Sequence, residues 1–151
     1  MASYKELNEL VKKAVSWEKE LKDLYDVAEF GLKDGESKKV VSVLRDNLVK
    51  KLEVLEHVDV EKYGMSEWLK YAPSHRDRDM LPRKSITKNS TPKEIFDQLL
   101  TFEEKLKDFY AAILESIQTE NQKELFSSLV SFKEKQINEI KRLMQNYNPV
   151  S

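Results

Sequence analysis

The chain has 151 residues, with 26 basic and 27 acidic side chains, a formal net charge of −1 and no cysteine. The length fits one domain, 1–151, which would bury roughly two-thirds of the surface that the unfolded chain exposes. The lack of thiols excludes disulfides, iron–sulfur clusters and cysteine nucleophiles, and the balanced charge provides no field for nucleic acid or an anionic membrane. No stretch has the ~20 consecutive apolar residues of a membrane span, so we expect a cytoplasmic protein.

The first predicted helix covers residues 3–32. Ser3 and Glu6 have the spacing of a capping box at its start. Apolar side chains then recur every three or four positions, as on one face of a helix. These positions are Leu7, Leu10, Val11, Ala14, Trp17, Leu21, Tyr25, Ala28 and Leu32.

A second helix is predicted from about Ser37, after a turn at Asp34-Gly35. Its apolar stripe consists of Val40, Val41, Leu44, Leu48, Leu52 and Leu55. So short a connection makes the two helices antiparallel neighbours. The sequence therefore predicts a helical hairpin over residues 3–58.

Residues 59–90 interrupt the helical pattern with a glycine, two prolines and a charged run. A connection of this length is too long for an ordinary loop, so it is predicted to be a crossover that packs along the bundle, with a short helix at Glu67–Tyr71. The side chains expected to hold it are Trp68, Leu69, Tyr71, Met80 and Leu81. Trp68 and Tyr71 either cover the open side of their own bundle or seal a homodimer contact.

A second helical hairpin is predicted over residues 91–147. Thr91-Pro92-Lys93-Glu94 combines an N-cap hydroxyl, a first-turn proline and a capping-box glutamate. The third helix follows with Ile95, Leu99, Phe102, Leu106, Tyr110, Ile113 and Ile117 on its stripe. Thr119 and Gln122 form a second box that opens the fourth helix, whose stripe is Leu125, Phe126, Leu129, Val130, Ile137, Ile140 and Met144.

The two hairpins are copies of one unit. Trp17-Glu18-Lys19-Glu20-Leu21-Lys22-Asp23-Leu24-Tyr25 returns as Phe102-Glu103-Glu104-Lys105-Leu106-Lys107-Asp108-Phe109-Tyr110, an offset of 85 positions (103 − 18). Two hairpins joined by one long crossover make an all-α, antiparallel four-helix bundle of the ferritin-like arrangement.

Glu18 and Glu103 are charged residues within apolar stripes and are predicted to point into the bundle, as is Glu134 between Val130 and Ile137. A single such glutamate would more often extend to water, but two at equivalent repeat positions favour burial. Buried carboxylates cost several kcal/mol each. A metal, shared protons, or the hydroxyls of Tyr25 and Tyr110 must compensate them.

On the repeat, the crossover and the Glu-x6-Tyr spacing, the chain resembles the rubrerythrin-like branch of the ferritin-like superfamily over essentially its whole length. The resemblance implies a di-iron site with a glutamate on helices one and three and Glu-x-x-His on helices two and four. Glu18, Glu103 and Glu134 match three of the six ligands. The other three positions carry residues that cannot bind a metal, Val49, Leu52 and Ile137.

Two functions follow from this degenerate site. The first is a bundle that has lost its di-iron centre and serves as a non-catalytic structural, interaction or small-ligand-binding protein. The alternative is a metal-binding protein or oxidoreductase that holds one divalent ion, Mn²⁺, Mg²⁺, Ca²⁺ or iron, on Glu18, Glu103 and Glu134. His57 is expected on the outward face and His75 in solvent. The sequence has no Ser-His-Asp set and no glycine-rich phosphate loop.

Overall fold

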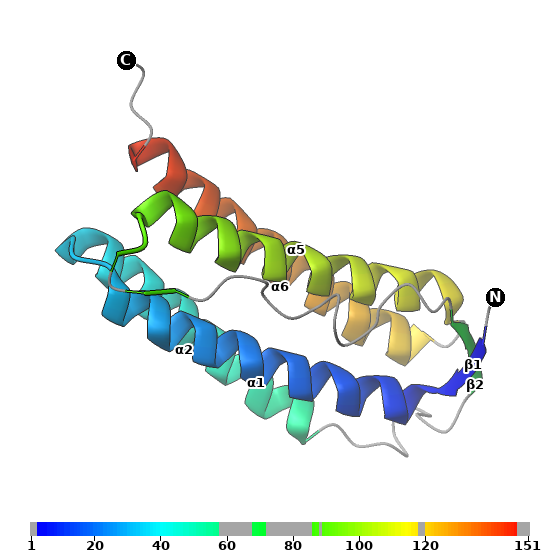
Figure 1. Ribbon diagram of the computed structural model, residues 1–151. Coiled ribbons are helices and arrows are strands. Elements are labelled where there is room, and N and C mark those ends of the chain that lie inside the picture. The colour runs from blue at the N-terminus through cyan, green and yellow to red at the C-terminus, as the bar shows by residue number, and fades with distance from the viewer. Residues whose placement is uncertain (1–2, 58–67, 72–85, 88, 118–119, 148–151) are drawn as a thin grey trace.

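Four helices dominate the computed structural model, which describes residues 3–57, 68–71, 86–87, 89–117 and 120–147. They are α1 (Leu7–Gly31), α2 (Gly35–Glu56), α5 (Pro92–Ser116) and α6 (Glu120–Tyr147). The helices pack as two hairpins, α1 with α2 and α5 with α6 (Figure 1). The predicted all-α class and the two helical hairpins are therefore confirmed. None of the described helices has the length and apolar character needed to cross a membrane.

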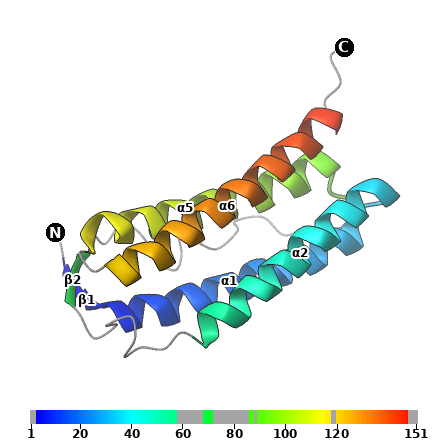
Figure 2. The ribbon, with the colours of Figure 1, turned by 180° about the vertical axis from the view of Figure 1, so that it is seen from behind.

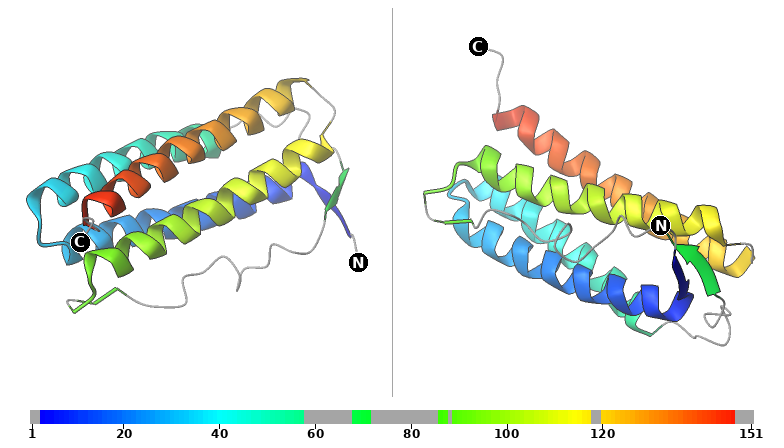
Figure 3. Two further views of the ribbon diagram at one scale, coloured as in Figure 1. Left: turned by 90° about the horizontal axis from the view of Figure 1, so that it is seen from above. Right: turned by 45° about the vertical axis from the view of Figure 1, so that its right-hand side comes forward.

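The directions of the helices define how the two hairpins meet. α1 and α5 lie next to each other and run in opposite directions (Figures 1 and 2). α2 and α6 also run in opposite directions, and a hydrogen bond from Lys51 to Ser128 joins them. The view from above separates the pair α1 and α5 from the pair α2 and α6 (Figure 3). α2 and α5 run in the same direction, so α2 ends at the end of the bundle opposite to the start of α5 (Figure 1).

Two helix starts are fixed by side chains that the sequence singles out. Thr91 accepts a hydrogen bond from the Glu94 backbone N–H at 3.1 Å, and the Glu94 side chain accepts one from the Thr91 backbone N–H at 3.2 Å. This confirms the predicted capping box. Asp34 caps α2 by accepting from the backbone N–H of Ser37 at 2.7 Å, so this helix begins two residues earlier than predicted. The second predicted box includes Thr119, which lies outside the described residues.

A small antiparallel sheet lies at the end of the bundle where α1 begins and α5 ends (Figures 1 and 3). β1 (Ser3–Glu6) pairs with β2 (Trp68–Tyr71), with Ser3 opposite Tyr71 and Glu6 opposite Trp68. The predicted capping box at Ser3 and the predicted short helix at 67–71 are therefore wrong. One helical turn gains few hydrogen bonds for the residues it fixes, whereas two extended segments satisfy each other's backbone groups.

The rest of the predicted crossover, including Met80, Leu81 and His75, lies outside the described residues. The same holds for the side chains of Trp68 and Tyr71, so covering of the bundle and a homodimer contact both stay predictions.

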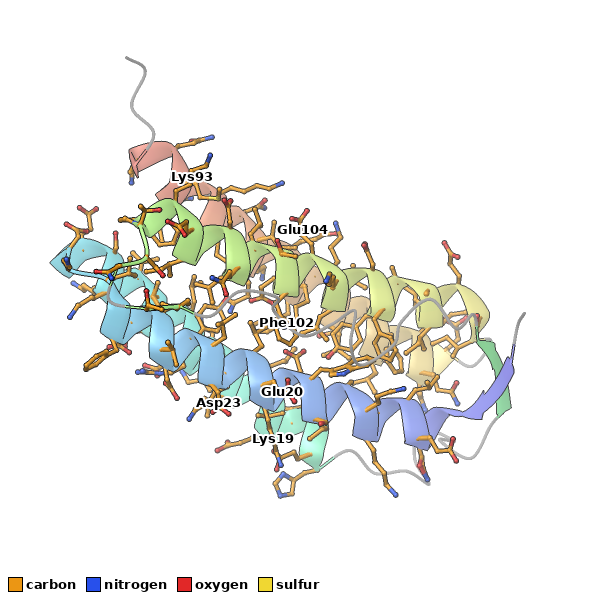
Figure 4. The ribbon with its side chains drawn as sticks, in the orientation of Figure 1. Lys19, Glu20, Asp23, Lys93, Phe102 and Glu104 are labelled. Carbon is orange, nitrogen blue, oxygen red and sulfur yellow. The ribbon has the colours of Figure 1, made fainter. Side chains whose placement is uncertain are left out.

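The core contains most of the apolar side chains predicted from the helical periodicity, together with Phe96, Phe109 and Leu143, which lie outside the predicted stripes. Trp17 and Phe109 pack edge to face with ring centroids 4.9 Å apart, joining α1 to α5. Phe102 lies between these two helices, whereas Glu104 lies on the outer side of α5 (Figure 4). The largest buried side chains include Tyr25, Tyr110, Phe96, Phe102, Phe109, Phe126 and Lys133. Lys133 is therefore a charged side chain that is buried together with aromatic residues in the middle of the bundle.

A candidate functional site: a closed ionic network in the core

Two glutamates lie in the centre of the bundle, and each points from its own helix toward the helix that carries the other. Glu18 of α1 is 2% exposed and Glu103 of α5 is fully buried. Their neighbours Glu20 and Glu104 are exposed on the outer sides of the same helices (Figure 4). The predicted inward orientation of Glu18 and Glu103 is confirmed, and it follows from their positions within continuous apolar stripes.

Each glutamate accepts a hydrogen bond from the tyrosine of the other repeat. The Tyr25 hydroxyl donates to Oε2 of Glu103 at 2.6 Å, and the Tyr110 hydroxyl donates to Oε2 of Glu18 at 2.5 Å. Both tyrosines are fully buried. Of the three kinds of compensation that the sequence leaves open, the tyrosine hydroxyls are therefore present, and their hydrogen bonds cross between the hairpins.

Lys133 of α6 supplies a cation that the sequence analysis did not predict. Its side chain is fully buried, and its Nζ donates to Oε1 of Glu18 at 2.6 Å. The same Nζ lies 2.8 Å from Oε1 of Glu103, an ion pair without the alignment of a hydrogen bond. One ammonium group thus neutralises charge on both carboxylates.

Gln136 lies one turn further along α6 and extends the network to α2. Its Nε2 donates to the backbone oxygen of Leu44 on α2 at 2.9 Å, and the same side chain lowers the pKa of Tyr25 against the larger opposing effect of burial. Lys133 and Gln136 are three residues apart and therefore lie on one face of α6. The six side chains of this network, hereafter the core network, are Glu18, Tyr25, Glu103, Tyr110, Lys133 and Gln136.

The third carboxylate predicted for the site does not reach it. Glu134 is exposed, so the expectation that it points inward is wrong. The buried positions of α6 are Lys133, Gln136 and Ile137, which moves the inward face by one residue relative to the prediction. Residue 134 follows Lys133 by 100° around the helix, enough to turn its side chain toward solvent.

The three positions at which the resemblance implies missing ligands lie in or near the core, whereas His57 lies at the surface. Leu52 and Ile137 are buried, and Val49 is half-buried. His57 is exposed at the end of α2, with Nδ1 2.8 Å from the backbone oxygen of Glu53, as expected for the outward face.

Burial and mutual attraction set the protonation of the network. Burial raises the pKa of Glu18, an effect that the Lys133 charge opposes and the Glu103 charge reinforces. Burial lowers the pKa of Lys133, but the attraction of Glu103 and Glu18 outweighs it, so the net pKa is raised. Burial and the nearby carboxylates raise the pKa of Tyr25 and Tyr110 well above the usual range. The tyrosines are therefore neutral donors and Lys133 is an ammonium ion at physiological pH.

The donor set does not fit the di-iron centre that the resemblance implies. Within the described ranges, no three His, Cys, Asp or Glu side chains form a group able to hold a metal ion. The two inward carboxylates direct their Oε1 atoms at an ammonium ion, which repels a metal cation and occupies the oxygens it would need. Divalent iron or manganese requires more oxygen or nitrogen ligands than this.

The core network is also closed to solvent. Each of its six side chains is at most 2% exposed. Two surface grooves of about 210 and 250 Å³ are lined by other residues, including Leu125 and Ser128 in one and Phe30 and Ile86 in the other. Within the part of the chain that the structure describes, the six side chains are therefore shielded from solvent.

The position of Lys133 could have been found from the repeat. Leu48 belongs to the predicted stripe of the second helix, and the offset of 85 places Lys133 at the equivalent position (48 + 85). Leu48 is 1% exposed and Lys133 is fully buried, so the equivalence holds. The residue type alone does not predict a lysine in the core, because lysine is almost never fully buried unless it is paired.

Comparisons of the chain with protein-family models, with curated proteins and with solved structures give no match.

Proposed function

We propose that this protein is a ferritin-like bundle in which the ammonium of Lys133 has replaced the metal ions, and that it acts as a non-catalytic structural or interaction protein. The observation that carries the proposal is the pair of contacts from one buried Nζ to Glu18 and Glu103, at 2.6 and 2.8 Å. These are the two carboxylates that correspond to the first- and third-helix metal ligands.

The ferritin-like assignment is supported by the arrangement of the helices. α2 ends at one end of the bundle and α5 begins at the other, so the connection has to travel the length of the bundle (Figure 1). One long connection between two hairpins is the ferritin-like arrangement. The inward glutamates lie on the first and third helices, each seven residues before a tyrosine.

The loss of metal chemistry is supported by the saturation of the carboxylates. Tyrosine hydroxyls and one ammonium take up three of the four carboxylate oxygens as hydrogen-bond acceptors, and the fourth is ion-paired. The alternative function, with a residual three-carboxylate site, lacks its third ligand because Glu134 is exposed.

Metal analysis tests this proposal. Protein purified from iron-supplemented cells is expected to contain iron far below one atom per chain, and added Fe²⁺ or Mn²⁺ is expected to leave the melting temperature unchanged. A ligand that bound the native state would raise it. About two iron atoms per chain, together with the absorption band of an oxo-bridged pair, would overturn the proposal.

A further inference from the structure

We propose that Glu18, Glu103, Tyr25 and Tyr110 form a preassembled receptor for a primary ammonium ion, which Lys133 fills from α6. The inference deepens the proposed function and rests on it, because it assigns the ligand chemistry of the same network. It predicts that the receptor accepts a free alkylammonium ion when the lysine side chain is removed.

The receptor is built by α1 and α5 alone. Each tyrosine hydroxyl fixes the Oε2 atom of the glutamate on the opposite helix, at 2.6 Å for Glu103 and 2.5 Å for Glu18. Both Oε1 atoms then converge on one nitrogen. Since the hydroxyls that hold the two Oε2 atoms come from α1 and α5, these two contacts are made without Lys133.

The two carboxylates of the receptor carry negative charge, which a bound cation would neutralise. Among the described residues, the buried charged side chains are Glu18, Glu103 and Lys133. At the position of α2 that is equivalent to Lys133, the chain has Leu48, so no second cation comes from that side. Removal of the lysine would leave two carboxylates with hydroxyl partners but without a counter-charge.

The Lys133→Ala substitution turns the receptor into an open binding site. It removes Cγ, Cδ, Cε and Nζ, the atoms that n-propylammonium contains. Cavities made by truncating a core side chain can bind a small molecule of matching shape. The cavity would end at the two carboxylate oxygens that contact Nζ, a geometry that selects a primary ammonium group with its three N–H donors.

Thermal unfolding of the full chain tests the inference. Lys133→Ala is expected to melt roughly 6–20 °C below the unsubstituted protein. Addition of n-propylammonium at 100 times its dissociation constant should recover about 5–10 °C. Tetramethylammonium at the same concentration, which lacks N–H donors, and sodium chloride at the same ionic strength should not.

Lys133→Met is the matched control, because its side chain fills the cavity. Equal shifts of the Ala and Met variants in n-propylammonium would overturn the inference. A rise with Mn²⁺ but not with n-propylammonium would also overturn it, since the carboxylates would then be selecting a metal ion.

If Lys133→Ala does not fold in buffer, the titration is made on Lys133→Ala combined with Glu18→Gln. This variant has one uncompensated carboxylate fewer and keeps Glu103 to bind the ammonium ion. The absence of a shift specific to n-propylammonium in this variant would overturn the inference. Iron in the unsubstituted protein would instead count against the proposed function, so the two failures are distinguishable.

Discussion

The hydroxyl of Tyr110 on α5 donates to Oε2 of Glu18 on α1 at 2.5 Å, between residues 92 positions apart in the chain. The reciprocal bond from Tyr25 to Glu103 spans 78 positions. These two bonds cross between the hairpins. They therefore link two units that otherwise pack mainly within themselves.

Tyr110→Phe is expected to lower the free energy of unfolding by about 1–3 kcal/mol, because a buried carboxylate loses a hydrogen-bond donor. The same substitution should cost less when Glu18 has been changed to Gln, since a neutral amide oxygen is a weaker acceptor than a carboxylate. Urea denaturation of the four proteins of this double-mutant cycle measures the coupling. Strictly additive losses would show that the Tyr110–Glu18 bond makes no net contribution.

Lys133→Met is expected to lower the free energy of unfolding at pH 7 by about 3–5 kcal/mol, because it leaves two buried carboxylates without their cation. Lys135→Met is the control, since Lys135 is exposed on the same helix and should change stability by no more than about 0.5 kcal/mol. The loss in Lys133→Met should shrink on acidification, as protonation removes the uncompensated charge. Equal losses for the two variants would mean that the buried ammonium is not needed.

The pH dependence of stability should report on Glu18. Its pKa is raised above the ordinary value of 4.5, chiefly by burial. The folded state therefore binds a proton more tightly than the unfolded state does, so this group's contribution to stability is complete below pH 4.5 and is lost as pH rises through the raised pKa. Glu18→Gln cannot titrate, and its free energy of unfolding relative to the unsubstituted protein should rise from pH 4.5 to 8.

The control for this pH series is Glu20→Gln, because Glu20 is exposed two residues away on α1. Its stability should follow the unsubstituted protein over the whole range. If the Glu18→Gln difference stayed constant or fell with pH, the carboxyl would not be destabilised by its surroundings. Lys133 should stay protonated throughout the series, since its pKa is raised above 10.5.

Periodicity and the internal repeat are sufficient to predict the four long helices and the burial of Glu18 and Glu103. Both signals are local, because an inward position is specified by its neighbours at three and four residues. The strand pair β1 and β2 could not be predicted in this way. It joins segments of four residues from distant parts of the chain, and each is extended only because the other supplies its backbone partners.

The sequence predicts only part of the candidate site. The inward orientation of Glu18 and Glu103 is confirmed, but the inward residue on α6 is Lys133 and not Glu134. A prediction based on the resemblance favours a third carboxylate, whereas electrostatics favours a cation beside two buried anions. The gap between Leu129 and Ile137 on the α6 stripe is filled at the helical spacing of four by Lys133, so the charge balance of the core selects the correct residue.

The difference between Leu48 and Lys133 makes the two halves of the repeat unequal partners. If two copies of the α1–α2 hairpin packed together as α1–α2 and α5–α6 do, they would enclose two glutamates and two leucines, with no positive charge between them. The lysine is supplied by one half for the carboxylates of both. Although the two hairpins share one sequence pattern, the first half lacks the cation that the second half supplies, so it cannot form the same core by pairing with itself.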